Sequence, residues 1–200
     1  MREEKAQLRS LYRQKIKNIR PVDFKNKTSQ ILENLSCLDV WNQSSTVAAY
    51  QALQDEISLE SFCQSHHQNR FVFPVIREDQ IEFYHPKQQD SFQKNSLSLL
   101  EPIPEKSKKI PVEEIDIFLV PGRVFDRQGG RLGRGRAYYD KALPASSLKI
   151  GLAFQEQIYN KHLPLESHDV MMDIIITDLF VLIPQIKAGK VLDQETIRYG

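Results

Sequence analysis

Short apolar runs alternate with helix-length segments along most of this chain, and that alternation limits its possible folds. The apolar runs are rich in β-branched and aromatic residues and span residues 46–50, 70–76, 115–120, 148–154 and 170–177. Parallel strands need a long crossover between them, and that crossover is usually a helix. The pattern therefore predicts an α/β fold with a mainly parallel sheet and helices on both faces. A length of 200 residues predicts one domain over residues 1–200.

The N-terminal segment is predicted to be a basic helix. Residues 4–19 carry apolar side chains at helical spacing, and basic side chains recur every four residues beside them. These basic residues are Lys5, Arg9, Arg13 and Lys17. Lys5 and Arg9 lie one helical turn apart, so they can point at the same anion. A solvated basic face is the alternative.

Three further helices are expected, over residues 24–38, near residues 59–66 and over residues 136–143. Residues 86–114 are polar and proline-punctuated, which predicts an excursion over the surface. Residues 185–200 are treated as a C-terminal extension, and we expect a short terminal helix there.

The distribution of charge favours a small anionic ligand. The net charge is only +1, yet residues 1–20 carry seven Lys or Arg against two Glu. Residues 120–140 carry five Arg against two Asp. Two basic patches on a nearly neutral protein suit a discrete anion better than broad nucleic-acid coating.

The sequence gives no sign of export or of membrane attachment. Cys37 and Cys63 form no zinc or CxxC spacing, which favours a reduced protein. The basic N-terminus is not followed by an apolar signal region, and residues 179–184 are too few to cross a bilayer. We therefore expect a cytoplasmic protein that binds no membrane.

A glycine- and arginine-rich loop is the strongest candidate for binding chemistry. It lies within VPGRVFDRQGGRLGRGRAYYD, residues 120–140, between a predicted strand and a predicted helix. Glycine lets main-chain N–H groups approach a ligand, and arginine offers a planar fork of donors to phosphate. We expect this loop to bind an anion, plausibly a polyphosphate. The alternative is a surface hairpin at residues 128–130 with solvated arginines.

The same segment resembles the signature of the 5-formyltetrahydrofolate cyclo-ligase family, with RLGxGxxYYD at its centre. Three other pieces agree in order: KAQLR from Lys5, LQDEI from Leu53, and PLESHD ending at Asp169. The resemblance implies a single Rossmann-like domain. It also implies an ATP- and Mg²⁺-dependent ligase of one-carbon metabolism that acts on small molecules and not on nucleic acid, and we expect a monomer.

The resemblance implies a set of ATP-binding residues, among which Arg131 and Arg134 would be catalytic. The expected ATP contacts are Lys5, Arg9, Arg131, Leu132, Gly133, Arg134, Gly135, Arg136, Ala137, Tyr138 and Tyr139. The family usually has glycine where Ala137 stands, so we expect an ordinary backbone conformation at this alanine.

The folate substrate and the metal would bind beside the ATP phosphates. The expected substrate contacts are Gln51, Glu56, Arg134, Gly135, Arg136, Ala137 and Tyr138. Glu56 would accept hydrogen bonds from the pterin N–H groups. Asp140 and Asp169 correspond to the metal ligands of the family, and Asp126 and Asp173 are second choices. His168 is expected to be structural, because no His/Cys set has zinc spacing.

Two other functions stay open at this stage. The basic helix and the arginine loop could grip a nucleic-acid backbone, whose binding would depend steeply on salt. A sugar-phosphate or acyl-CoA enzyme on a similar sheet is the other possibility.

Overall fold

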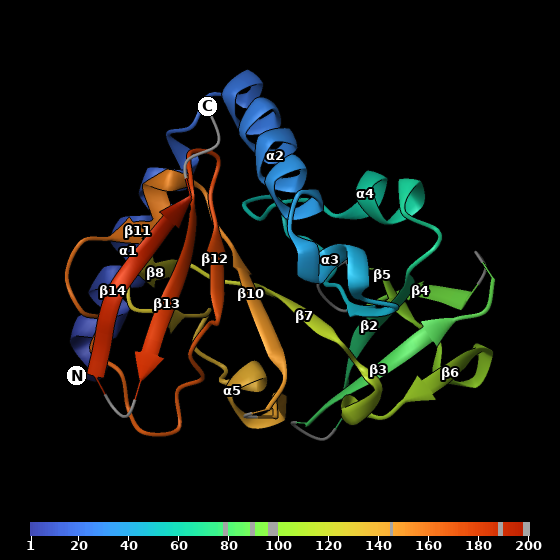
Figure 1. Ribbon diagram of the computed structural model, residues 1–200. Coiled ribbons are helices and arrows are strands. Elements are labelled where there is room, and N and C mark those ends of the chain that lie inside the picture. Colours follow the sequence, from blue (N-terminus) through green and yellow to red (C-terminus); the bar gives the residue numbers. More distant parts are fainter. Residues whose placement is uncertain (78–79, 89–90, 96–99, 145, 188–189, 198–200) are drawn as a thin grey trace.

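A nine-stranded sheet runs through the protein, and the computed structural model describes residues 1–77, 80–88, 91–95, 100–144, 146–187 and 190–197 (Figure 1). In spatial order its strands are β14 (Lys190–Ile197), β13 (Val181–Lys187), β12 (Ile174–Ile176), β10 (Leu148–Leu152), β7 (Ile117–Pro121), β1 (Thr46–Ala48), β2 (Arg70–Arg77), β3 (Gln80–Pro86) and β6 (Ser107–Ile110).

The centre of the sheet is parallel and its two edges are antiparallel. Strands β12, β10, β7, β1 and β2 pair in parallel, whereas the β13–β14 hairpin closes one edge and β3 with β6 closes the other. The prediction of an α/β fold with a mainly parallel central sheet is confirmed.

Helices cover both faces of this sheet. Along β7, Ile117 and Leu119 belong to one apolar cluster while Phe118 and Val120 belong to another, because successive side chains of a strand point to opposite faces. The first cluster receives α2 (Pro21–Ser36), α3 (Asp39–Gln43) and α4 (Glu60–Ser65). The second is contacted by Tyr139 of α5 (Tyr138–Ala142), which lies below α2 in Figure 1.

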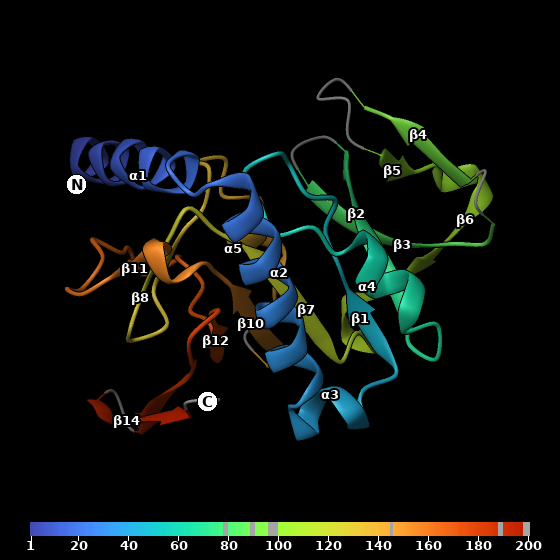
Figure 2. The ribbon, with the colours of Figure 1, turned by 90° about the horizontal axis from the view of Figure 1, so that it is seen from above.

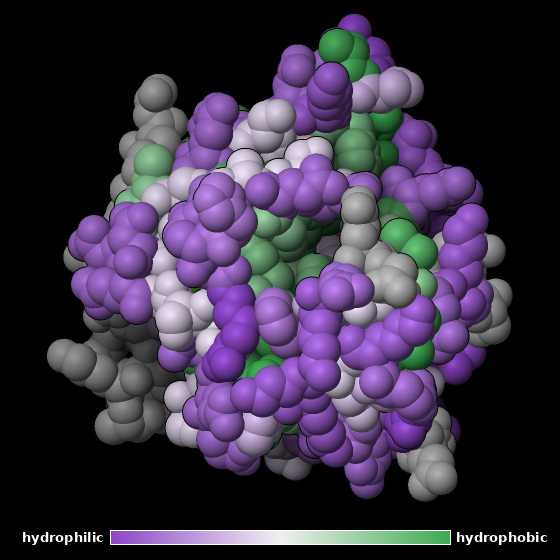
Figure 3. All heavy atoms as spheres, turned by 90° about the vertical axis from the view of Figure 1, so that its right-hand side faces the viewer, coloured by the Kyte–Doolittle hydropathy of each residue, from purple (hydrophilic) through white to green (hydrophobic). Residues whose placement is uncertain are grey.

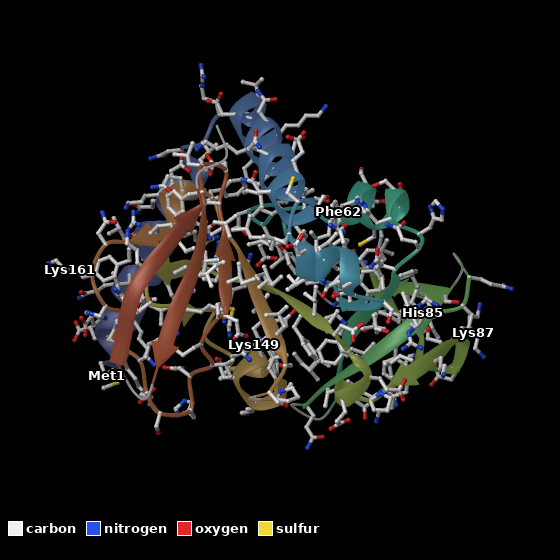
Figure 4. All side chains as sticks on the ribbon, viewed as in Figure 1. Met1, Phe62, His85, Lys87, Lys149 and Lys161 are labelled. Carbon is white, nitrogen blue, oxygen red and sulfur yellow. The ribbon has the colours of Figure 1, made fainter. Side chains whose placement is uncertain are left out.

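Aromatic rings fill the space where α3 and α4 meet the sheet. Phe62 of α4, labelled in Figure 4, lies with its ring centroid 5.0 Å from that of Trp41 of α3. Both side chains are almost fully buried, at 6% and 3% exposure. Burial of this apolar area is the main favourable term that holds these short helices in place.

The N-terminal helix α1 (Arg2–Lys17) packs away from the main sheet, as the view from above shows (Figure 2). It covers a three-stranded sheet of β11 (Ile158–Tyr159), β8 (Val124–Asp126) and β9 (Arg131–Leu132). Tyr12 of α1 forms a small apolar cluster with Val124, Leu132 and Leu163. The basic helix is thereby held next to the strand that leads into the arginine loop.

Two expectations about local structure are wrong. Residues 86–114 are not only a surface excursion, because they contain a hairpin of β4 (Phe92–Lys94) with β5 (Leu100–Pro102), the 3-10 turns η2 (Pro104–Lys106) and η3 (Val112–Glu114), and the edge strand β6. The C-terminal extension forms no helix over residues 185–187 and 190–197, which belong to β13 and β14. Residues 188, 189 and 198–200 of that expectation lie outside the described residues.

Main-chain pairing explains both differences. β6 pairs with β3, and β14 pairs with β13, so each segment gains ladder hydrogen bonds that the pattern of its own side chains does not predict. Across the described ranges, no helix combines the length and apolar character needed to span a bilayer.

Candidate active site

A cavity of about 700 Å³ opens beyond the carboxyl ends of β1 and β7. Tyr50 and Gln51, just after β1, lie on one side of it, and Pro121 and Gly122, at the end of β7, lie on another. This is where ligands bind in open parallel sheets. Figure 3 shows the right-hand side of Figure 1, where hydrophobic (green) atoms appear between hydrophilic (purple) ones; the cavity itself is defined by its lining residues.

Every residue predicted from the sequence to bind ATP, folate or metal lines this one cavity. These residues are Lys5, Arg9, Gln51, Glu56, Arg131, Leu132, Gly133, Arg134, Gly135, Arg136, Ala137, Tyr138, Tyr139, Asp140 and Asp169. The fold thus brings together segments that lie far apart in the sequence. What each residue does there stays a prediction.

The glycine- and arginine-rich loop joins β9 to α5 along the cavity. Gly135 has φ +103°, a conformation that favours glycine. Within the described ranges, the main-chain N–H groups of Gly133 and Gly135 donate no hydrogen bond to protein. The carbonyl of Gly133 accepts a hydrogen bond from Arg9 Nε at 2.8 Å, which ties α1 to the loop. Unused N–H groups on a loop beside basic side chains can bind an anion.

The backbone at Ala137 is not ordinary, contrary to expectation. Ala137 has φ +52° and ψ +25°, in the left-handed region, and precedes the first residue of α5. Among the described residues it is the only one other than glycine with a positive φ. The chain must turn sharply from the loop into α5, and this turn needs a left-handed residue even where the side chain is a methyl group.

Arg131 is buried at the back of the cavity and holds Asp140. Its Nη1 donates to the carbonyl of Pro121 at 3.1 Å and its Nη2 donates to Asp140 Oδ1 at 3.1 Å. Its guanidinium also lies 5.5 Å from the ring centroid of Tyr139. The Nε atom is buried and has no partner among the described residues. Arg131 is therefore fixed in place, with its position set by the end of β7.

Lys5 also lines the cavity and is buried against two carboxylates. Its Nζ lies 2.7 Å from Asp169 Oδ2 and 2.9 Å from Glu166 Oε2. Burial opposes the charge of Lys5, but these two carboxylates outweigh it and raise the pKa of the ammonium group. Burial likewise opposes ionisation of Asp169, yet Lys5 and the main-chain N–H of Glu166 lower its pKa. Lys5 and Arg9 line one cavity but have different protein partners.

The carboxylates of the cavity fall into two groups. Glu166, His168 and Asp169 offer ligand atoms that all lie within 4.8 Å of one another. Asp140 belongs to a separate group, where its Oδ1 accepts hydrogen bonds from Arg131 and from the main-chain N–H of Val170. Glu166 was missed in the sequence because only its neighbour Asp169 matches a metal-binding position of the family.

The second-choice carboxylates do not line the cavity. Asp126 accepts hydrogen bonds from the main-chain N–H groups of Gln128, Gly130 and Leu163 and thereby shapes the turn after β8. Asp173 accepts a hydrogen bond from the main-chain N–H of Lys149. Both are tied into the local backbone.

Glu56 lines the cavity and is held by two hydrogen bonds. Its Oε1 accepts a hydrogen bond from Arg134 Nε at 2.8 Å, and its Oε2 accepts one from the main-chain N–H of Leu53 at 3.0 Å. Burial raises the pKa of the Tyr50 hydroxyl, and the charge of Glu56 adds to that effect. Burial also raises the pKa of Tyr139, so both phenols stay neutral donors.

One wall of the cavity is apolar, and the sequence did not reveal it. Pro74, Ile76, Ile81 and Leu100 line this wall from β2, β3 and β5. Ile76 is 46% exposed and Leu100 is 43% exposed, although both are large apolar side chains. Such a surface suits the face of a flat ring. Arg13, by contrast, lies outside the cavity and lines a neighbouring groove with Lys17.

Comparison with known proteins shows the family to which the chain belongs. The family model described as the 5-formyltetrahydrofolate cyclo-ligase family matches residues 1–178, and the chain belongs to that family. The 5-formyltetrahydrofolate cyclo-ligase of Haemophilus influenzae is 28% identical over 87% of this chain and 98% of its own length. A probable 5-formyltetrahydrofolate cyclo-ligase of Schizosaccharomyces pombe is 25% identical over 87% of this chain and 95% of its own length.

A solved structure matches across nearly the whole chain. The NMR structure of Aquifex aeolicus 5,10-methenyltetrahydrofolate synthetase superposes with a TM-score of 0.80 at 25% identity. The match covers 94% of this chain and 96% of that one. The expectation of an ATP-dependent ligase of this family is confirmed.

Proposed function

We propose that this protein converts 5-formyltetrahydrofolate to 5,10-methenyltetrahydrofolate, with ATP and Mg²⁺ as co-substrate and cofactor. The observation that carries the proposal is one cavity lined by a loop with unused N–H groups, a buried lysine, an apolar wall and Glu56. The chemistry requires that a triphosphate and a formyl group be held side by side, and this cavity offers a distinct surface to each.

The proposed reaction has two steps. The γ-phosphoryl group leaves ADP and forms a bond to the formyl oxygen, which gives a phosphorylated formyl group (an imidate phosphate). N10 of the folate then attacks the formyl carbon and loses its proton, and the C–O bond breaks with release of phosphate. Both steps depend on positioning and on stabilisation of charge, with no covalent bond to the protein.

The phosphate side of the cavity would be formed by the loop and α1. The N–H groups of Gly133 and Gly135 would donate to phosphate oxygens, and Arg134 would stabilise the charge that develops as the phosphoryl group moves. Arg131 would act from the position in which the carbonyl of Pro121 and Asp140 hold it, and its buried Nε has no partner among the described residues. Arg9 donates a hydrogen bond to the carbonyl of Gly133 in the loop, so it is already placed beside the proposed phosphate site.

The acidic residues fit a magnesium ion by the chemistry of their donors. Mg²⁺ prefers oxygen ligands, commonly one or two carboxylates together with phosphates and waters. Asp140 and Asp169 would hold it, with Glu166 close enough to Asp169 to take part. When bound, Mg²⁺ would neutralise charge on the phosphates of ATP.

The folate side would be formed by Glu56 and the apolar wall. Glu56 would accept hydrogen bonds from the pterin N–H groups, and Gln51 and Tyr138 lie on the same cavity to contact the ring system. The apolar wall from β2, β3 and β5 would pack against the face of the folate.

The test is the appearance of the methenyl chromophore. Purified protein incubated with 5-formyltetrahydrofolate, ATP and Mg²⁺ should form methenyltetrahydrofolate with one ADP released per product, and removal of Mg²⁺ with a chelator should stop both. Omission of the folate gives the background of ATP hydrolysis. ATP consumption that does not depend on the folate, or no product, would refute the proposal.

A further inference from the structure

Asp55 precedes Glu56 in the chain and accepts hydrogen bonds from two arginines. Its Oδ1 accepts a hydrogen bond from Arg134 Nη2 and its Oδ2 accepts one from Arg123 Nη1. The Asp55 side chain is 20% exposed, the Arg123 side chain 8%, and the Arg134 side chain 38%. The series Arg123–Asp55–Arg134 thus runs from the protein interior to the edge of the cavity.

Arg134 is shared between two carboxylates. Its Nη2 binds Asp55 while its Nε donates to Glu56 Oε1 at 2.8 Å. That same Glu56 oxygen is one that an incoming pterin N–H group would need. Substrate binding at Glu56 would therefore compete with Arg134 for one of its two carboxylate partners.

We propose that Asp55 is a positioning residue that keeps Arg134 at the cavity edge while Glu56 exchanges this arginine for the substrate. The inference rests on the proposed function, because it takes the folate ring to be the ligand of Glu56. Asp55 itself lies outside the residues that line the cavity.

The charges of the group support this role. The group contains two arginines and two carboxylates. Arg134 therefore remains paired with Asp55 when Glu56 accepts hydrogen bonds from the neutral N–H groups of the substrate instead. Burial opposes ionisation of Asp55, but the hydrogen bonds from Arg123 and Arg134 outweigh it and lower its pKa. Asp55 is thus a fixed anion near neutral pH. Without it, Glu56 would be the only acidic partner of Arg134 in this group, and release of Glu56 would leave the arginine unpaired.

Arg123 holds the Asp55 side chain in place from the protein interior. Its main-chain N–H donates to the carbonyl of Leu132 at 2.8 Å, and its own carbonyl accepts from Gln157 Nε2 at 3.3 Å. Arg123 is 6% exposed. The cation at the inner end of the series is therefore fixed to the backbone near β8 and β9, while Arg134 at the outer end sits on the loop.

A double-mutant cycle tests this role by binding of 5-formyltetrahydrofolate in the absence of ATP. Asp55→Asn should weaken binding by about 10-fold, the size expected for loss of one charge-assisted hydrogen bond. In the Arg134→Gln background, the same Asp55→Asn change should alter binding by less than about 2-fold, because no arginine then competes for Glu56.

Asp178→Asn is the matched control, because Asp178 pairs with Lys27 at 2.8 Å and its side chain is 5% exposed, outside the cavity. It should lower the melting temperature without changing folate binding. If Asp55→Asn binds folate like the wild type, or weakens binding equally in both backgrounds, the positioning role is wrong. If the wild-type protein binds no 5-formyltetrahydrofolate, the proposed function is wrong and so is this inference.

Discussion

Ala137 adopts a backbone conformation that alanine seldom takes, at the junction of the loop and α5. A left-handed conformation brings the Cβ atom close to the following carbonyl and costs roughly 1–2 kcal/mol for a residue with a side chain. The structure keeps it because the loop must turn there to reach the cavity. A single residue therefore carries local strain next to the candidate phosphate site, where strain often collects.

Replacing Ala137 with glycine should stabilise the protein. Ala137→Gly removes the left-handed strain, partly offset by the greater freedom of glycine in the unfolded chain, for a net gain of about 0.5–1 kcal/mol in the free energy of unfolding. Urea denaturation would measure it through the midpoint. Ala6→Gly, inside α1, is the control and should cost about 1 kcal/mol. A loss of stability in Ala137→Gly would mean that the left-handed conformation carries no strain.

At the same scale, the sequence supplied residue types but not their partners. Lys5 and Asp169 were both predicted to act at the site, yet nothing in the chain indicated that they pair, or that Glu166 joins them. Residues so far apart in sequence meet only through the fold. Asp55 was not among the predicted site residues, and only the fold places Arg123 and Arg134 beside it.

Helix α1 carries two candidate ATP ligands, Lys5 and Arg9, and Tyr12 on the same helix packs against the rest of the protein. Tyr12 is 3% exposed and packs edge-on against Tyr159, with ring centroids 6.3 Å apart. Its hydroxyl donates to the carbonyl of Ile158 at 3.3 Å. Lys5 and Arg9 lie on the same helix, so their positions depend on how Tyr12 anchors it.

Removing the Tyr12 ring should therefore weaken ATP binding from a distance. Tyr12→Ala should cost about 3 kcal/mol of stability, the usual size for truncation of a buried aromatic ring, and raise the Kd for ATP. Tyr12→Phe keeps the ring and loses one hydrogen bond, so it should cost about 1 kcal/mol with little change in Kd. Calorimetric titration with Mg-ATP, together with urea denaturation, separates the two effects. Unchanged ATP affinity in folded Tyr12→Ala would show that α1 is held by other contacts.

The strands at the sheet centre were predictable, and so was β3, whereas β6 and β14 were not. The runs that became β1, β7 and β10 are buried and apolar enough to read as strands from sequence alone. Strands β6 and β14 depend on a neighbour that is already in place, because edge strands carry polar residues and gain stability by pairing. Their secondary structure is therefore set by tertiary contacts.

On the scale of the whole molecule, the cavity lies where the loop, α1 and the sheet meet, which places cationic groups around one small volume. A protein with a net charge of +1 can bind a compact anion there without attracting long nucleic acids. The concentration of cationic groups is local, so a mononucleotide should outcompete a phosphate backbone.

Mg-ATP should therefore stabilise the folded protein against heat. At 100 times its Kd it adds about 2.7 kcal/mol, which for a chain of this size raises the melting temperature by roughly 5–10 °C. A single-stranded oligonucleotide at matched phosphate concentration is the control and should raise it little. Stabilisation by the oligonucleotide alone, lost steeply as salt increases, would instead favour the nucleic-acid alternative.

The sequence by itself determined the α/β class, the parallel centre of the sheet and the types of side chain available for a site, because periodicity, burial and loop chemistry are local properties. The tertiary structure alone decided that these side chains surround one cavity, that Ala137 is left-handed, that Arg131 is locked to Asp140, and that Asp55 links Arg123 to Arg134. Those facts depend on which distant segments come together, and packing of the whole chain, not any local pattern, selects these contacts.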